Sequence, residues 1–115
     1  MEVVIYHNPR CSKSRKTLDL LRSKNIEPRI IEYLKTPPLP QELGTILRML
    51  GVGPRELIRS GEPEFRENGL GDPGLTDDQL IDAMIQHPIL IQRPIVVAEG
   101  RAAIGRPPEN VLDIL

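Results

Sequence analysis

Near its N-terminus the chain reads Val3-Val4-Ile5-Tyr6-His7-Asn8-Pro9-Arg10-Cys11-Ser12-Lys13-Ser14-Arg15, and this stretch decides the fold. Its first four residues are apolar and β-branched or aromatic, which predicts a short buried strand. Beyond it, helical spacing predicts a helix to about Lys24, on the residues Thr17, Leu18, Leu20 and Leu21. A strand, a loop and a helix therefore follow one another, with a cysteine in the loop.

A second β-branched run, Arg29-Ile30-Ile31-Glu32-Tyr33, predicts a second strand. A strand, a helix and a strand in this order form a right-handed crossover, so we expect the two strands to be parallel. Cys11 then follows the carboxyl end of the first strand, which is where open α/β sheets bind ligands.

Cys11 is the only cysteine in the sequence, and its position predicts a reactive thiol. Unsatisfied N–H groups and the positive end of the dipole at a helix N-terminus favour a thiolate, and Arg10, Lys13 and Arg15 add positive charge. The alternative is a small buried hydrophobic residue, but the polar and cationic neighbours favour the reactive thiol. One cysteine forms no internal disulfide, so a redox cycle needs a second thiol from another molecule.

The middle of the chain changes character after the break at Thr36-Pro37-Pro38-Leu39-Pro40. A helical stripe follows on Leu43, Ile46, Leu47 and Leu50, and Gly51 ends this helix. Pro54 fits the first position of another short helix, which we expect to carry Leu57, Ile58 and Arg59.

Residues 60–75 are rich in Gly and Pro and predict a loop. Thr76-Asp77-Asp78-Gln79 then has the pattern of a capping box that opens a helix to about His87. We therefore expect residues 37–88 to form an all-helical insert between two halves of a sheet.

The C-terminal part predicts a hairpin and a last helix. Pro94 to Ala98 predicts a strand, and Glu99-Gly100-Arg101-Ala102 a tight turn into Ala103-Ile104-Gly105. Arg106-Pro107-Pro108-Glu109 starts the helix, whose expected packing face is Val111, Leu112 and Ile114.

This order of elements predicts one α/β domain over residues 1–115, a thioredoxin-like (glutaredoxin-like) sheet flanked by helices, with the helical insert in mid-chain. Pro94 begins a strand at the position where such folds place a cis-proline beside the active cysteine.

Composition excludes several classes of function. The 115 residues include 15 basic and 16 acidic side chains, for a net charge of −1, so no overall field recruits nucleic acid or an anionic membrane. Apolar runs stay well short of the ~18 residues of a membrane span, and the N-terminus lacks the order of a signal peptide. We expect a cytoplasmic protein that binds neither nucleic acid nor membrane. One cysteine and two separated histidines also lack zinc-ligand spacing, so no metal site is predicted.

Five blocks that span nearly the whole chain carry a resemblance to a known family. They are Ile5 to Arg15, Leu57-Ile58-Arg59, Thr76 to Asp82, His87 to Val97, and Gly105-Arg106-Pro107-Pro108-Glu109. In these blocks the chain resembles the glutaredoxin-dependent arsenate reductases, the ArsC-type proteins of thioredoxin-like fold. Since it stops at Leu115, it is most similar to their compact, arsenate-reductase-like subgroup.

The resemblance implies an arsenate reductase that produces arsenite, with glutathione as reductant, glutaredoxin as partner and no bound cofactor. It implies Cys11 as the nucleophile and three arginines that hold the oxyanion, namely Arg59, Arg93 and Arg106. Arginine suits this task because its planar, permanently charged fork binds two oxygens, and nearby cations lower the pKa of a thiol.

Supporting roles are expected for His7, Ser14 and Arg15. By its place in the family motif His7 tunes the thiolate; the alternative is a loop histidine bonded to backbone. Ser12 and Ser14 are expected to cap the helix rather than bind the anion, and Arg15 to cap the helix or reach the anion.

Two other functions stay open. The first is a glutathione-linked thiol oxidoreductase of unknown substrate. The second is a non-enzymatic, Spx-like regulator that docks on RNA polymerase. Such regulators usually carry a second cysteine where this chain has Ser14, and a docking protein does not need an arginine trio around its thiol. A phosphatase-type loop is disfavoured because Thr17 stands where that loop needs an arginine.

Overall fold

The computed structural model describes residues 2–115, which form two compact units. We call Met1–Thr36 with Arg93–Leu115 the sheet unit, and Pro37–Gln92 the helical unit. The helical unit covers the range predicted for the insert and continues to Gln92. That the whole chain is one domain stays a prediction.

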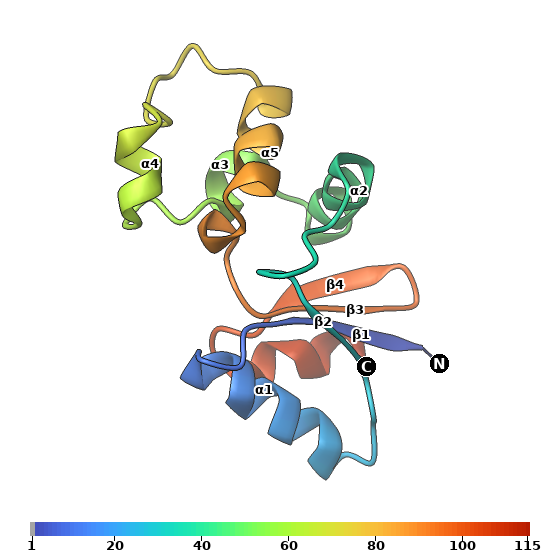
Figure 1. The fold of residues 1–115 in the computed structure, drawn as a ribbon. Coiled ribbons are helices and arrows are strands. Elements are labelled where there is room, and N and C mark those ends of the chain that lie inside the picture. The colour runs from blue at the N-terminus through green and yellow to red at the C-terminus, as the bar shows by residue number, and fades with distance from the viewer. Residues whose placement is uncertain (1) are drawn as a thin grey trace. The chain divides into compact units, whose positions relative to one another are not determined.

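The sheet unit holds four strands in the order β2-β1-β3-β4 (Figure 1). Their bounds are β1 Val3–His7, β2 Arg29–Glu32, β3 Ile95–Ala98 and β4 Arg101–Ile104. β1 runs parallel to β2 and antiparallel to β3, which is antiparallel to β4. The parallel pair and the mixed sheet flanked by helices are as predicted from the sequence.

Two helices pack on one face of this sheet, α1 (Ser12–Ser23) and the 3₁₀ helix η2 (Pro108–Ile114), and they also contact each other (Figure 1). Eight buried residues form the core between them and the strands: Val3, Ile5, Leu18, Leu21, Val96, Ala98, Val111 and Ile114. Burying a Leu or Ile side chain fully contributes about 1.5–3 kcal/mol, so this cluster fixes α1 against β1. The prediction for Leu112 is wrong, since its side chain is exposed.

The hairpin is tighter than predicted. Glu99 and Gly100 alone make the turn, with φ of 49° and 78°, and Arg101 and Ala102 already belong to β4. Two residues of positive φ match the right-handed twist of the strands, so a two-residue turn is sufficient. The Arg93–Pro94 peptide bond is cis, as predicted, and so is Arg106–Pro107, which was not predicted.

The helical unit contains four α-helices and one 3₁₀ helix. They are α2 (Pro40–Leu50), α3 (Pro54–Leu57), α4 (Pro63–Glu67), α5 (Asp77–Gln86) and η1 (Pro88–Leu90). The predicted capping box of α5 is present: Gln79 N–H donates to Thr76 Oγ1 at 3.2 Å, and Thr76 N–H to Gln79 Oε1 at 2.8 Å. Gly51 ends α2 in the left-handed conformation, at φ 72°.

Two predictions for this unit are wrong. The helix α3 stops at Leu57, because Ile58 pairs with Ile91 in an isolated antiparallel bridge and Arg59 N–H donates to the Leu90 carbonyl at 2.7 Å. Within the predicted loop 60–75, Pro63 begins the short helix α4. None of the α4 residues is buried, so this helix has no apolar periodicity by which to recognise it.

Candidate active site

Cys11 is the N-cap residue of α1, at the end of a tight loop that leaves β1. Its own N–H donates to the Asn8 carbonyl at 3.0 Å, and the Arg15 N–H donates to the Cys11 carbonyl at 3.0 Å. Both bonds fix the Cys11 backbone between the loop and the first turn of the helix. Cys11 is partly exposed and forms no disulfide, as a nucleophile requires.

The surroundings lower the pKa of the Cys11 thiol below its ordinary value. Partial burial acts the other way and raises the pKa. The backbone N–H groups of Ser14 and Lys13 and the guanidinium of Arg93 outweigh it, because positive groups near the sulfur favour the thiolate. The reactive thiol predicted from the helix N-terminus thus has a physical basis in this geometry.

Ser14 and His7 form a buried pair beneath the loop. The Nδ1 atom of His7 lies 2.6 Å from Ser14 Oγ, which also accepts a hydrogen bond from the Asn8 N–H at 3.0 Å. Ser14 is fully buried and His7 only 6% exposed. The prediction that Ser14 caps α1 is therefore wrong, since Cys11 is the N-cap residue and Ser14 Oγ bonds to His7 and to the Asn8 N–H instead.

The side chain of His7 bonds to Ser14 Oγ and not to backbone, so the alternative of a loop histidine bonded to backbone is wrong. Burial, together with Arg22 and Arg15, lowers the pKa of His7, although Glu32 acts to raise it. A neutral imidazole at pH 7 follows. That His7 tunes the thiolate stays a prediction; in the structure His7 contacts the side chain of Ser14.

Arg15 is exposed and donates from Nη1 to the Pro9 carbonyl at 2.9 Å. This bond stabilises the loop between β1 and α1, which we call the cysteine loop. Sequence reasoning did not single out Asn8, whose side-chain Oδ1 accepts from the Arg10 N–H at 3.0 Å. An Asn before Pro is a common start of such a turn, and this signal was available in the sequence.

Arg93 lies at the cis peptide bond before Pro94, near enough to Cys11 that its side chain favours the thiolate. Its Nε and Nη1 atoms are buried, yet neither has a hydrogen-bond partner among residues 2–115. A buried N–H group without a partner costs about 1–3 kcal/mol, and more when the group is charged. An oxyanion at this place would satisfy both atoms at once.

Arg106 follows Gly105 at the end of β4 and donates from Nη1 to the Arg93 carbonyl at 3.4 Å. Its guanidinium thus lies beside the segment that carries Arg93 and Pro94, which we call the proline loop. The Gly105 N–H donates to the Pro94 carbonyl at 2.9 Å. A Cβ on Gly105 would lie 2.8 Å from Pro94 Cγ, so only glycine allows this approach.

The sheet unit therefore brings together three of the predicted residues: Cys11, Arg93 and Arg106. Arg59 belongs to the helical unit. There its Nη1 lies 2.7 Å from Glu62 Oε1 and 3.4 Å from the Ile89 carbonyl. The assignment of these four residues to a site stays a prediction.

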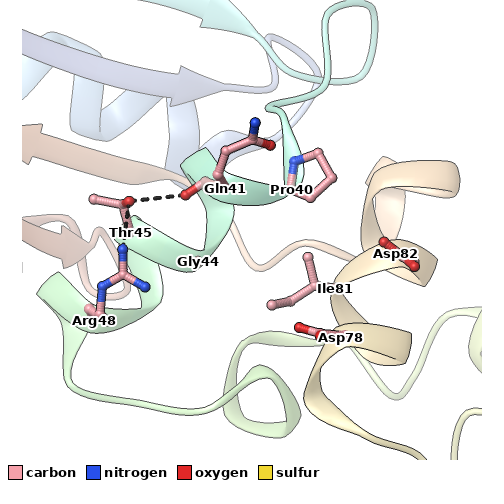
Figure 2. Close-up of a pocket in the computed structure, with 8 residues that line it drawn as sticks. All are labelled: Pro40, Gln41, Gly44, Thr45, Arg48, Asp78, Ile81 and Asp82. Carbon is pink, nitrogen blue, oxygen red and sulfur yellow. Dashed lines mark hydrogen bonds between the residues drawn. The ribbon is translucent and has the colours of Figure 1, made fainter.

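A separate pocket of about 570 Å³ lies between α2 and α5 in the helical unit (Figure 2). Its lining contains the cation of Arg48 and the carboxylates of Asp78 and Asp82, but no thiol or imidazole. Arg48 donates to Thr45 Oγ1 at 3.0 Å, and Thr45 donates to the Gln41 carbonyl at 3.0 Å, so these two side chains bond within α2 (Figure 2). We assign no chemistry to this pocket.

Residues 2–115 contain no cluster of three or more His, Cys, Asp or Glu side chains that could hold a metal ion. In the same part of the chain, no helix has both the length and the apolar character needed to span a bilayer.

Comparisons with known proteins identify the family of this chain. Residues 6–114 match the model of the ArsC family. An uncharacterized protein of Escherichia coli strain K12, YfgD, is 50% identical over 99% of this chain and 97% of its own length. An arsenate reductase of Rhizobium meliloti strain 1021 is 50% identical over 100% of this chain and 82% of its own length. The solved structure of an arsenate reductase from Vibrio cholerae superposes with a TM-score of 0.97 at 52% identity, covering 100% of this chain and 98% of that one. The chain belongs to the ArsC family, and its fold is the thioredoxin-like fold of those reductases.

Proposed function

We propose that this protein is an arsenate reductase in which Cys11 is the nucleophile. The observation that carries the proposal is the Arg93 guanidinium, which has two buried N–H donors without a partner and lies beside a thiol whose pKa it helps to lower. A nucleophile beside an anion-binding fork is the arrangement that attack on an oxyanion needs. Extensive identity with proteins named arsenate reductases supports the same assignment.

The first step is attack of the Cys11 thiolate on As(V). The S–As bond forms, one As–O bond breaks, and the departing oxygen leaves as water after protonation. Arg93 and Arg106 would stabilise the charge on the remaining oxygens, since an arginine fork binds two of them. Arg59, the third arginine that the resemblance implies, has Nε and Nη2 as further donors, because its ion pair uses Nη1.

The second step needs another thiol. Reduction of As(V) to As(III) takes two electrons, which come from two thiols that become one disulfide, with release of arsenite. The sequence has one cysteine, so the second thiol belongs to another molecule. We propose glutathione for this role, and glutaredoxin for reducing the resulting Cys11–glutathione mixed disulfide.

A coupled assay tests this function. Arsenate reduction by the purified protein is followed as loss of NADPH in the presence of glutathione, glutaredoxin and glutathione reductase. Cys11→Ser is expected to abolish turnover, and Arg93→Ala to lower kcat/KM about 10- to 100-fold, the value of one charged hydrogen-bonding group. Arg59→Ala and Arg106→Ala test the other two arginines in the same way.

Arg66→Ala is a matched control, because Arg66 is an exposed arginine of α4 that the proposal does not use. This variant is expected to behave as the wild type. A folded wild type with a reactive thiol but no turnover would contradict the proposal and favour a glutathione-linked oxidoreductase of another substrate.

A further inference from the structure

A second pocket, of about 290 Å³, opens in the sheet unit beside the cysteine loop. Its lining comes from two neighbouring segments, the loop after β1 and the turn after β2. The lining residues are His7, Asn8, Pro9, Arg10, Glu32, Leu34 and Lys35. None of the reactions described above uses this pocket, although two of its lining residues, Pro9 and Arg10, come directly before Cys11 in the chain.

The loop side of the pocket is held in one shape. The Arg10 N–H donates to Asn8 Oδ1 at 3.0 Å, and the Pro9 carbonyl accepts from Arg15 Nη1 at 2.9 Å. Asn8 is 5% exposed and its N–H is bonded to Ser14 Oγ. Small-molecule sites are usually formed before the ligand arrives, and these bonds give the pocket that property.

The charges around the pocket form a definite pattern. Arg10 and Lys35 are exposed cations, one on each segment, and Glu32 supplies one carboxylate. Glu32 lies opposite His7 in the register of β1 and β2, and its Oε1 lies 3.8 Å from Lys35 Nζ in a solvent-exposed pair. Such a pair is weak, so a ligand can displace it at little cost. Leu34, 40% exposed, adds an apolar surface.

Two cations and one carboxylate are the complement of a ligand with two carboxylates and one ammonium group. Glutathione carries these three charges, together with a thiol. Arg10, which lines the pocket, directly precedes Cys11, so a ligand that extends from the pocket along the loop would bring its sulfur toward the nucleophile, which is the placement that the second step requires.

We propose that the pocket between the cysteine loop and the β2 turn is the binding site for the charged groups of glutathione, with Arg10 and Lys35 on its carboxylates and Glu32 on its ammonium. This assignment rests on the proposed function in taking glutathione as the second thiol. It makes Arg10 and Lys35 determinants of reductant specificity, separate from the arginines that would hold arsenate.

Thiol–disulfide exchange tests the pocket without arsenate. The Cys11 thiolate attacks one sulfur of oxidised glutathione, the disulfide bond of that molecule breaks, a Cys11–glutathione disulfide forms, and one glutathione thiolate leaves. The rate is measured by intact-mass spectrometry for the wild type, Arg10→Ala, Lys35→Ala and the double variant. Cystamine, a disulfide with two ammonium groups and no carboxylate, is the second probe.

Each single variant is expected to slow exchange with oxidised glutathione about two- to fivefold, the range of one exposed ion pair, and the double variant about tenfold. Exchange with cystamine is expected not to slow, and Arg10→Lys is expected to restore the wild-type rate with oxidised glutathione. Lys24→Ala and Arg29→Ala remove an exposed cation elsewhere in the sheet unit and control for the change in net charge.

Equal slowing with both disulfides would overturn the proposal, because it would indicate a general loss of Cys11 reactivity. Wild-type rates in the double variant, or the same loss in Lys24→Ala and Arg29→Ala, would overturn it as well. Selective loss with oxidised glutathione in a protein that does not reduce arsenate would support the pocket and refute the proposed function.

Discussion

Replacing Gly105 by alanine tests how closely the proline loop packs against α1. A Cβ at this position would lie 2.5 Å from Thr17 Oγ1, 2.8 Å from Pro94 Cγ and 3.1 Å from Thr17 Cγ2. None of these atoms can move aside easily. Thr17 is fully buried and its hydroxyl donates to the Lys13 carbonyl at 2.8 Å, while Pro94 belongs to a rigid ring.

Overpacking of a buried position costs about 1–3 kcal/mol, and three contacts shorter than normal place Gly105→Ala in the upper half of this range, about 2–3 kcal/mol. Unfolding entropy of about 2.1 cal/mol/K per residue gives about 0.24 kcal/mol/K for 115 residues, so the expected fall in Tm is about 8–12 °C. We also expect lower arsenate turnover, because the strain lies between Arg93 and Arg106.

Urea unfolding followed by circular dichroism measures the stability. Gly53→Ala is the matched control, since a Cβ at Gly53 meets no atom within 4 Å, and it should stay within about 0.5 kcal/mol of the wild type. Thr17→Ala removes two of the three contacts at Gly105, so the double variant should be more stable than the sum of the two single effects predicts. A Gly105→Ala protein as stable as Gly53→Ala would refute the reasoning.

Three further predictions concern the thiol, the histidine and a helix cap. Arg93→Ala should raise the pKa of Cys11, measured as thiolate absorbance against pH, whereas Lys24→Ala should leave the titration unchanged. Burial lowers the pKa of His7 below its usual 6.5, so between these two values the unfolded chain binds more protons and stability falls as the pH is lowered. Urea unfolding across this window should therefore show a smaller pH dependence in His7→Gln, and an unchanged dependence would contradict the assignment. Thr76→Ala removes the acceptor for the Gln79 N–H and should cost about 1 kcal/mol in the same unfolding experiment, against no measurable loss for Thr36→Ala in the exposed turn after β2.

The parts of the fold that local patterns determine were predictable from the sequence. The β1 strand, the α1 helix and the α5 capping box each depend on residues a few positions apart, and all three are present. The end of α3 was not predictable, because Ile58 pairs with Ile91, a partner 33 positions away. Helix α4 was missed because it buries no side chain and so leaves no periodic signal.

In the candidate site, too, local sequence patterns predict some features, and tertiary packing determines the others. The place of Cys11 at a helix N-terminus follows from a strand, a loop and a helix in sequence, and the structure has this order. The burial of Ser14 against His7 depends on how α1 packs on β1, which local propensity does not specify. The two unsatisfied donors of Arg93 also depend on tertiary structure, since a sequence shows the charge of an arginine but not its partners.

The most direct test of the central claim is a single turnover with arsenate and glutathione in the absence of glutaredoxin, followed by intact-mass spectrometry and measurement of arsenite. We predict one glutathione per wild-type chain, attached at Cys11, with an equal amount of arsenite, and neither product in Cys11→Ser. Arsenite released by Cys11→Ser at the wild-type rate, or by a wild type whose thiol stays unmodified throughout, would contradict it.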